Sequence, residues 1–138
     1  MDIGIGIIGL GNIGSYLYKE INLKKTEIYK NLGYKIKIVG VSVKNPKKKR
    51  NINLKKKLIF KDPVKLAKNK KINILFELIG TSDGISKKIV ETALKNKKHV
   101  ITANKALISK HGEYLSKLAQ NNNVNLEFEA SVGGGIPV

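Results

Sequence analysis

Short apolar runs alternate with longer amphipathic segments along the chain, without an internal repeat. Several of the short runs are continuously apolar, which is typical of strands buried on both faces of a parallel sheet. We expect strands at residues 3–8, 35–43, 57–60, 72–79, 99–102 and 124–128, and helices at 13–31, 63–69, 85–96 and 112–121. Strand and helix in repetition predict an α/β domain with a doubly wound parallel sheet.

Length and composition narrow the class of protein. The 138 residues suit one domain that folds without metals or disulfides. The sequence contains no cysteine, which excludes thiol catalysis, thiolate metal sites and disulfide bonds. With no signal-like start and no apolar run of membrane-spanning length, we expect a cytoplasmic protein without a membrane partner.

The net charge of +17 raises the question of nucleic-acid binding, since clustered cations bind phosphate. All but one of the 27 basic residues are lysines, and they are scattered among many isoleucines and asparagines. Proteins that read nucleic acids usually need arginine forks or stacking aromatic side chains as well. A compositional bias towards Lys, Ile and Asn explains the charge, so we expect no nucleic-acid partner.

The first expected strand runs directly into "GLGNIG", and a helix follows. In the G-x-G-x-x-G spacing, the first glycine permits a tight turn, the second lets a pyrophosphate approach the backbone, and the third lets the helix pack on the strand. The helix N-terminus adds N–H groups and a partial positive charge. A glycine-rich turn without a ligand is the alternative, but the flanking strand and helix favour dinucleotide binding. The expected contacts are Gly9, Leu10, Gly11, Asn12, Ile13 and Gly14.

The end of the second strand bears on which dinucleotide is preferred. An NAD-binding domain normally has an acidic side chain there for the ribose 2′-hydroxyl. The sequence has no acidic residue between Glu27 and Asp62, whereas Lys44 and Arg50 could meet a 2′-phosphate. We therefore expect NADP(H) to be preferred over NAD(H); the alternative is that these residues form a solvated lysine loop.

Two further segments fall at the carboxyl ends of expected strands, where open α/β sheets bind ligands. In "ELIGTSDG", Thr81 and Ser82 could bond to cofactor ribose or phosphate, or could cap the following helix together with Asp83. In "TANKALIS", Thr102 is another expected cofactor contact, and Lys105 stands before an apolar helical turn that aims it into the crevice.

The two histidines have no visible partner for nucleophile activation. His99 adjoins an expected strand, and His111 opens an expected helix. We interpret both as structural or exposed residues.

The order of these motifs is similar to that of one known family. The segments "GIIGLGNIGS", "ILFELIG", "KKHVITANKALISKHGEYLSKLA" and "LEFEASVGGGIPV" together resemble the nucleotide-binding domain of homoserine dehydrogenase over essentially the whole chain. The resemblance implies a Rossmann-type domain for NAD(P)-dependent interconversion of L-aspartate 4-semialdehyde and L-homoserine, in threonine and methionine synthesis. It implies that Lys105 lies near the nicotinamide, and that Lys44 stands where the family usually has an arginine for the 2′-phosphate. It also places Thr81 where the family commonly has a second glycine.

The same resemblance gives the terminal block "EASVGGGIPV" a role. In the family this block leads from the cofactor domain to the substrate domain, and a glutamate and backbone carbonyls in it hold a monovalent cation. By position this implicates Glu129 with the carbonyls of Val132, Gly134 and Ile136. Oxygen ligands of this kind suit a hard cation such as Na+ or K+.

The resemblance further implies that the substrate-binding residues, with the aspartate and lysine for proton transfer, belong to a second domain. We therefore expect residues 1–138 to be the cofactor domain, ending at the hinge to a substrate domain that this chain lacks, and to be inactive alone. We expect the full-length protein to be a homo-oligomer that acts on a small-molecule substrate. A stand-alone dinucleotide-sensing regulatory module is the alternative; "TANKALIS" and the terminal glycines, which such a module does not need, oppose it.

Overall fold

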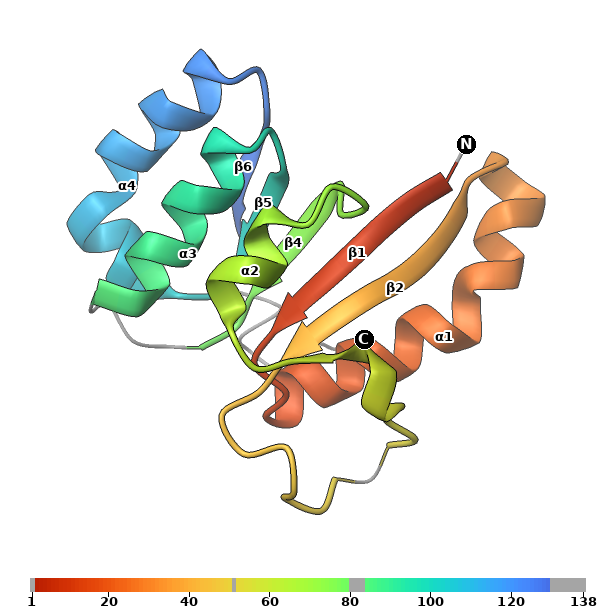
Figure 1. The fold of residues 1–138 in the computed structure, drawn as a ribbon. Coiled ribbons are helices and arrows are strands. Elements are labelled where there is room, and N and C mark those ends of the chain that lie inside the picture. The colour runs from red at the N-terminus through yellow and green to blue at the C-terminus, as the bar shows by residue number, and fades with distance from the viewer. Residues whose placement is uncertain (1, 51, 80–83, 130–138) are drawn as a thin grey trace.

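The computed structural model describes residues 2–50, 52–79 and 84–129. In this part of the chain, six parallel strands form one sheet in the order β3-β2-β1-β4-β5-β6 (Figure 1). The strands are β1 (Asp2–Ile8), β2 (Lys35–Ser42), β3 (Ile59–Phe60), β4 (Ile74–Glu77), β5 (His99–Thr102) and β6 (Leu126–Phe128). The helices are α1 (Asn12–Leu32), α2 (Pro63–Lys68), α3 (Gly84–Lys95) and α4 (Lys105–Asn121), with a 3-10 turn, η1 (Lys56–Leu58), before β3. The doubly wound parallel sheet expected from the sequence is confirmed.

The strand order reverses next to β1. The chain moves outward from β1 to β2 and β3, crosses back through α2 to β4, and then moves outward on the other side to β6. At the reversal the carboxyl ends of β1 and β4 lie side by side, with Ile8 in register with Glu77. Open α/β sheets bind ligands outside the carboxyl ends of their strands at such a reversal, so this edge is where a site is expected.

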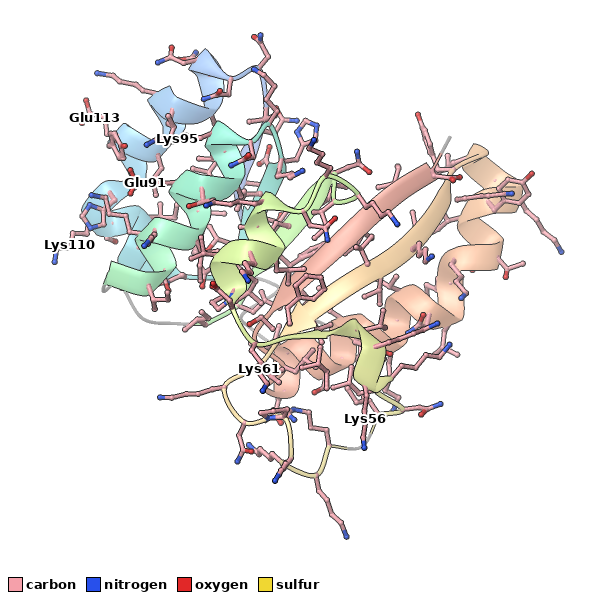
Figure 2. All side chains as sticks on the ribbon, viewed as in Figure 1. Lys56, Lys61, Glu91, Lys95, Lys110 and Glu113 are labelled. Atoms are coloured by element: carbon pink, nitrogen blue, oxygen red, sulfur yellow. The ribbon has the colours of Figure 1, made fainter. Side chains whose placement is uncertain are left out.

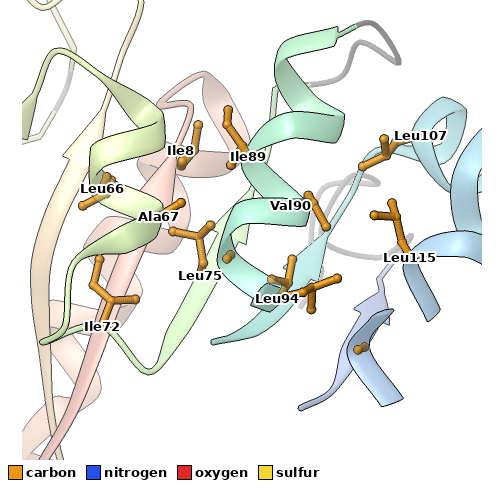
Figure 3. Close-up of a cluster of buried hydrophobic side chains, with 13 residues drawn as sticks. Ile8, Leu66, Ala67, Ile72, Leu75, Ile89, Val90, Leu94, Leu107 and Leu115 are labelled. Atoms are coloured by element: carbon orange, nitrogen blue, oxygen red, sulfur yellow. The ribbon is translucent and has the colours of Figure 1, made fainter. Parts of the chain in front are cut away.

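Helices cover both faces of the sheet, with α1 on one face and α2, α3 and α4 on the other (Figure 1). Under the three helices, Ile8 and Leu75 of the central strands belong to one apolar cluster with Leu66 of α2, Ile89 of α3 and Leu107 of α4 (Figure 3). These five side chains are at most 2% exposed. Burial of apolar area is worth roughly 25 cal/mol per Å², so this cluster is a main source of the stability of the fold.

On the α1 face, the connection from β2 to β3 takes the place of a second helix. Its residues Ile52, Leu54 and Leu58 pack against the apolar cluster that α1 forms with β1 and β2. The hydroxyl of Tyr18 in α1 donates to the carbonyl of Asn53 at 3.1 Å. The lysine-rich connection is therefore anchored to the domain by apolar contacts and a hydrogen bond.

Lysines project from several separate parts of the domain. Lys56 and Lys61 flank β3, whereas Lys95 and Lys110 belong to α3 and α4 (Figure 2). All four are exposed. None of the helices in the described ranges is long and apolar enough to cross a membrane.

Several expected strands are shorter than the sequence indicated, including that at 124–128, which consists of Leu126–Phe128, and that at 35–43, which ends at Ser42. Residues 57 and 58 belong to η1, so β3 consists of two residues. Strand β4 begins at residue 74 because Asn73 is fixed to Gly4: its N–H donates to the Gly4 carbonyl at 2.8 Å, and its side-chain oxygen accepts from the Gly4 N–H at 2.7 Å. The expectation of continuous strands over 57–60 and 72–79 was therefore wrong at their ends.

Helix α4 begins at Lys105, whereas the sequence analysis expected a start at residue 112. The side chain of Asn104 accepts from the N–H of Leu107 at 3.0 Å and caps this earlier start. The glycine at 112 disfavours a helix by about 1 kcal/mol relative to alanine. Burial of Leu107 in the core outweighs that cost, and His111 lies within the helix instead of opening it.

Candidate functional site

The turn between β1 and α1 depends on two close backbone approaches. Gly9 has φ 97°, a conformation that side chains disfavour, and its N–H donates to the carbonyl of Ser42 at 2.9 Å. A Cβ on Gly14 would lie 2.0 Å from the carbonyl oxygen of Gly9. Glycine is therefore required at both positions for α1 to start directly beyond the end of β1.

Gly11 differs from these two glycines because the space beside it is open. A Cβ built on Gly11 meets no atom of the described residues within 4 Å, and the residue is exposed. Gly11 is also the N-cap of α1, where the first N–H groups of the helix and its dipole favour an anion. The turn thus fits a pyrophosphate held against the backbone, which is the role that the G-x-G-x-x-G spacing predicted.

The other residues of the turn have different surroundings. Leu10 is buried in the apolar cluster under α1, Ile13 is half-buried, and Asn12 is exposed as the first residue of α1. The carbonyl of Leu10 accepts from the Ser15 hydroxyl at 3.1 Å. Of these residues, Asn12 is the one whose side chain stands at the surface beside Gly11.

Arg50, in the lysine-rich connection, contacts the glycine-rich turn. Its Nε donates to the carbonyl of Leu10 at 3.1 Å, and its Nη1 donates to the carbonyl of Lys48 at 3.2 Å. The guanidinium therefore fastens the connection to the turn, a structural role that the sequence analysis did not foresee. Lys44 is exposed two residues beyond the end of β2. Both cations lie on the segment that leaves the carboxyl end of β2.

A buried carboxyl group, Glu77, lies at the end of β4. Its side chain is fully buried, its Oε1 accepts from the Thr102 hydroxyl at 2.7 Å, and its Oε2 accepts from the Ile79 N–H at 2.9 Å. The Ser86 hydroxyl of α3 makes a longer contact of 3.5 Å with Oε2, and the Asn104 side chain is a further hydrogen-bond partner. Glu77 thus joins β4 and β5 to the starts of α3 and α4.

Burial raises the pKa of Glu77 above its ordinary value of 4.5, because an apolar interior disfavours the ionised form. The hydrogen bonds from Thr102, Ile79, Asn104 and Ser86 act in the opposite direction, since all are donated to the carboxyl oxygens. Burial is the larger effect, and the balance leaves a carboxyl group that takes up a proton more readily than an exposed one.

The sequence contains a signal for a buried carboxyl group at Glu77. In "ILFELIG" one acidic residue interrupts a run that is otherwise apolar. A charged group in a buried strand needs hydrogen-bond partners, so the pattern indicates polar side chains next to this strand. The register pairs Glu77 with Thr102, whose hydroxyl is one such partner.

The expected site residues Thr102 and Lys105 occupy different depths. Thr102 is fully buried, and its hydroxyl accepts from the Asn104 N–H at 2.9 Å while donating to Glu77. Its side chain therefore supports the site from the buried interior and is not exposed at its surface. Lys105 is exposed as the first residue of α4, directly after the Asn104 cap.

The remaining expected site residues fall mostly outside the described ranges. Glu129 is described and exposed, and its N–H donates to the carbonyl of Thr102 at 3.0 Å, which places it at the same edge of the sheet. His99, interpreted as structural, accepts from the Asn125 N–H through Nδ1 at 3.1 Å. The residues that lie outside the described ranges are Thr81, Ser82, Val132, Gly134 and Ile136.

The sheet order, the glycine-rich turn and the open N-terminus of α1 define a Rossmann-type dinucleotide-binding domain. The family model described as "Homoserine dehydrogenase, NAD binding domain" matches residues 9–129. The chain belongs to this family, as its motifs indicated, and family membership does not favour the regulatory-module alternative.

Named relatives and solved structures agree with this assignment. The chain is 36% identical to the homoserine dehydrogenase of Neisseria gonorrhoeae over 136 residues, which is 99% of this chain and 31% of the relative. The S. aureus homoserine dehydrogenase at pH 7.5 superposes with a TM-score of 0.87 at 36% identity, over 95% of this chain and 34% of that one. The enzyme of Thiobacillus denitrificans gives a TM-score of 0.81 at 30% identity, over 95% of this chain and 30% of that one. The chain thus spans about a third of the length of the relatives it matches.

Alanine at Gly11 and alanine at Gly14 should have different effects, because Gly11 leaves space for a ligand whereas Gly14 is required by the fold. Gly14→Ala should lower the free energy of unfolding by about 3 kcal/mol, because its methyl group overlaps the Gly9 carbonyl. Gly11→Ala should change it by less than about 1 kcal/mol, yet weaken NADPH binding by about tenfold or more, because the methyl group enters open ligand space. Denaturant unfolding and titration calorimetry measure the two effects, and unimpaired NADPH binding by Gly11→Ala would contradict the assignment of that space.

The raised pKa of Glu77 should make stability depend on pH in a defined direction. Between pH 4.5 and the higher folded-state pKa, the folded protein binds more protons than the unfolded chain, so stability falls as pH rises. Relative to Glu77→Gln, which cannot ionise, the wild type should lose stability with a slope of at most about 1.4 kcal/mol per pH unit. Urea unfolding across this range tests the slope, with the exposed Glu113→Gln correcting for net charge. An increase with pH in the free energy of unfolding of the wild type relative to Glu77→Gln would contradict this prediction.

Proposed function

We propose that this chain supplies the NADP(H)-binding part of a homoserine dehydrogenase that interconverts L-aspartate 4-semialdehyde and L-homoserine in threonine and methionine synthesis. The observation that carries the proposal is the open backbone at Gly11, at the N-terminus of α1, beside the turn that Arg50 fastens to the segment after β2. Family membership supports the reaction class.

The preference for NADP(H) over NAD(H) is proposed from charge. Lys44 stands beyond the carboxyl end of β2, where a carboxylate would bind the 2′-hydroxyl of NAD, and the sequence from residue 28 to residue 61 contains no acidic residue. Arg50 uses Nε and Nη1 on backbone carbonyls, so it contributes its charge to the turn while also holding it. Lys44 is therefore the cation assigned to the 2′-phosphate.

The bound dinucleotide would supply the hydride for aldehyde reduction, and residues of this chain would orient it. The N–H groups at the start of α1 and the backbone of Gly11 would hold the pyrophosphate. Lys105, at the carboxyl side of β5, would hold the carboxamide or ribose region with its ammonium group, or stabilise the aldehyde oxygen as charge develops there. The acid/base group for the reaction is assigned to a substrate domain.

A monovalent cation, Na+ or K+, is proposed near Glu129. The N–H of Glu129 bonds to the carbonyl of Thr102, so the residue lies at the edge of the sheet where the dinucleotide is expected. Its carboxylate is a suitable oxygen ligand for such an ion. The backbone carbonyls that would complete the site are those of Val132, Gly134 and Ile136, by resemblance.

Three properties of the full-length enzyme are also proposed: a cytoplasmic location, a homo-oligomeric state, and the absence of nucleic-acid or membrane partners. The absence of cysteine from this sequence fits the cytoplasmic location. The wide spread of the lysines fits the third, because nucleic-acid binding uses a basic patch or stripe. The oligomeric state is proposed by analogy with the family alone.

Wild-type protein should bind NADPH more tightly than NADH. Lys44→Ala should weaken NADPH binding by about tenfold with little change for NADH, because one charge-assisted hydrogen bond to the 2′-phosphate is lost. Arg50→Ala should weaken both cofactors, because it releases the carbonyl of Leu10 in the shared turn. Calorimetric titration of both cofactors measures the ratio, with Lys95→Ala on α3 as the matched surface control. Equal wild-type affinities, or an NADPH preference that survives the Lys44→Ala Arg50→Ala double substitution, would overturn the assignment.

Lys105→Ala should affect turnover more than cofactor affinity. In this chain it should weaken NADPH binding by roughly one charged hydrogen bond, a factor of about ten. In a full-length enzyme that carries the substrate domain, it should lower kcat at saturating NADPH by more than that factor, because an interaction that strengthens in the transition state appears in turnover. Steady-state kinetics with aspartate semialdehyde tests this. If the Lys105→Ala enzyme keeps wild-type turnover, Lys105 contributes no more to the reaction than the other exposed lysines.

A further inference from the structure

The starts of α3 and α4 meet at one buried group. Ser86, in the first turn of α3, contacts Oε2 of Glu77, and Asn104, the N-cap of α4, is a hydrogen-bond partner of the same carboxyl group. Helix N-termini carry partial positive charge and attract anions. Here the protein places its own carboxyl group between two of them, fully buried.

A series of hydrogen bonds leads from this carboxyl group to the N-cap and first turn of α4, the turn that contains Lys105. The Thr102 hydroxyl donates to Glu77 at 2.7 Å and accepts from the Asn104 N–H at 2.9 Å. The Asn104 side chain then accepts from the Leu107 N–H at 3.0 Å, which fixes the first turn of α4. Lys105 is the first residue of that turn.

The position of Lys105 is electrostatically unfavourable for the isolated helix. A cation at a helix N-terminus opposes the dipole, and the first turn of α4 has no acidic side chain to compensate. This cost is modest for an exposed side chain, and other contacts at the helix start can offset it. The buried network of Glu77, Thr102 and Asn104 provides them.

We propose that Glu77 is a positioning residue, which fixes Lys105 at the cofactor site through Thr102 and Asn104. The inference rests on the proposed function, because it assigns Lys105 a contact with the dinucleotide. It extends that function to side chains that are themselves buried beneath the surface of the site. Removing the network should therefore cost cofactor affinity only as long as Lys105 is present.

A double-mutant cycle in NADPH affinity tests this dependence. Thr102→Val removes the hydroxyl at nearly constant shape, and it should weaken NADPH binding by about fivefold when Lys105 is present. In a Lys105→Ala background the same substitution should have an effect of less than about twofold, because the residue through which it acts is gone. Thr102→Ser keeps the hydroxyl and should retain wild-type affinity. A merely structural role would give the same loss in both backgrounds.

Two further variants control for stability. Thr92→Val removes a hydroxyl that bonds to the Lys88 carbonyl within α3, away from the network, and should leave NADPH affinity unchanged. If Thr102→Val fails to fold, Asn104→Ser serves instead: it keeps an uncharged N-cap acceptor for the first turn of α4 and loses the amide donor to Glu77. It should show the same dependence on Lys105.

The outcomes separate the two proposals. If the wild-type chain does not bind NADPH, the proposed function fails, and the inference that rests on it fails too. If the wild type binds NADPH and Thr102→Val binds it equally well, or loses the same factor with and without Lys105, the positioning role alone is overturned. A loss of NADPH affinity that occurs when Lys105 is present and disappears in the Lys105→Ala background supports the positioning role.

Discussion

The contact between the carbonyl of Gly9 and the Cα of Gly14 is the constraint on which the site depends. A side chain at residue 14 would meet that carbonyl at 2.0 Å, so α1 can begin directly beyond β1 only without one. The close approach brings the N-terminus of α1 to the edge where the strand order reverses. Backbone N–H groups are then available to an anionic ligand without any side chain being required, and the choice of ligand would fall to the neighbouring strand ends.

The buried carboxyl group of Glu77 connects several elements at the same edge of the sheet. Burying a carboxyl group is unfavourable unless its oxygens are hydrogen-bonded. Here the donors come from the Ile79 backbone, from Thr102, and from the first residues of two helices. These hydrogen bonds offset the cost of burial and link β4 and β5 to the starts of α3 and α4. The network holds the start of α4 in place after β5, at the edge of the sheet where the dinucleotide is proposed to bind.

Features that depend on local spacing were predictable from the sequence, and those that depend on distant pairing were not. The glycine-rich turn was predictable because all its determinants lie within six residues. The bond from Arg50 to the Leu10 carbonyl was not, since it joins residues 40 apart through a loop without regular structure. The contact of Glu77 with Thr102 requires the register of β4 on β5, which no local pattern fixes. The early start of α4 was a missed local signal, because Asn104 is a favourable N-cap.

The distribution of arginine and lysine follows from what each side chain can do. Arg50 is the single arginine among 27 basic residues, and it holds two backbone carbonyls from one planar group. Lysine carries a point charge on a flexible stem and cannot fix two acceptors in this way. A bias towards lysine can therefore change solvated positions such as Lys56 and Lys95 with little effect on the fold. At Lys44, the position proposed for the 2′-phosphate, the resemblance implies an arginine in the family, and lysine there is a less directional cation that acts through charge more than through geometry.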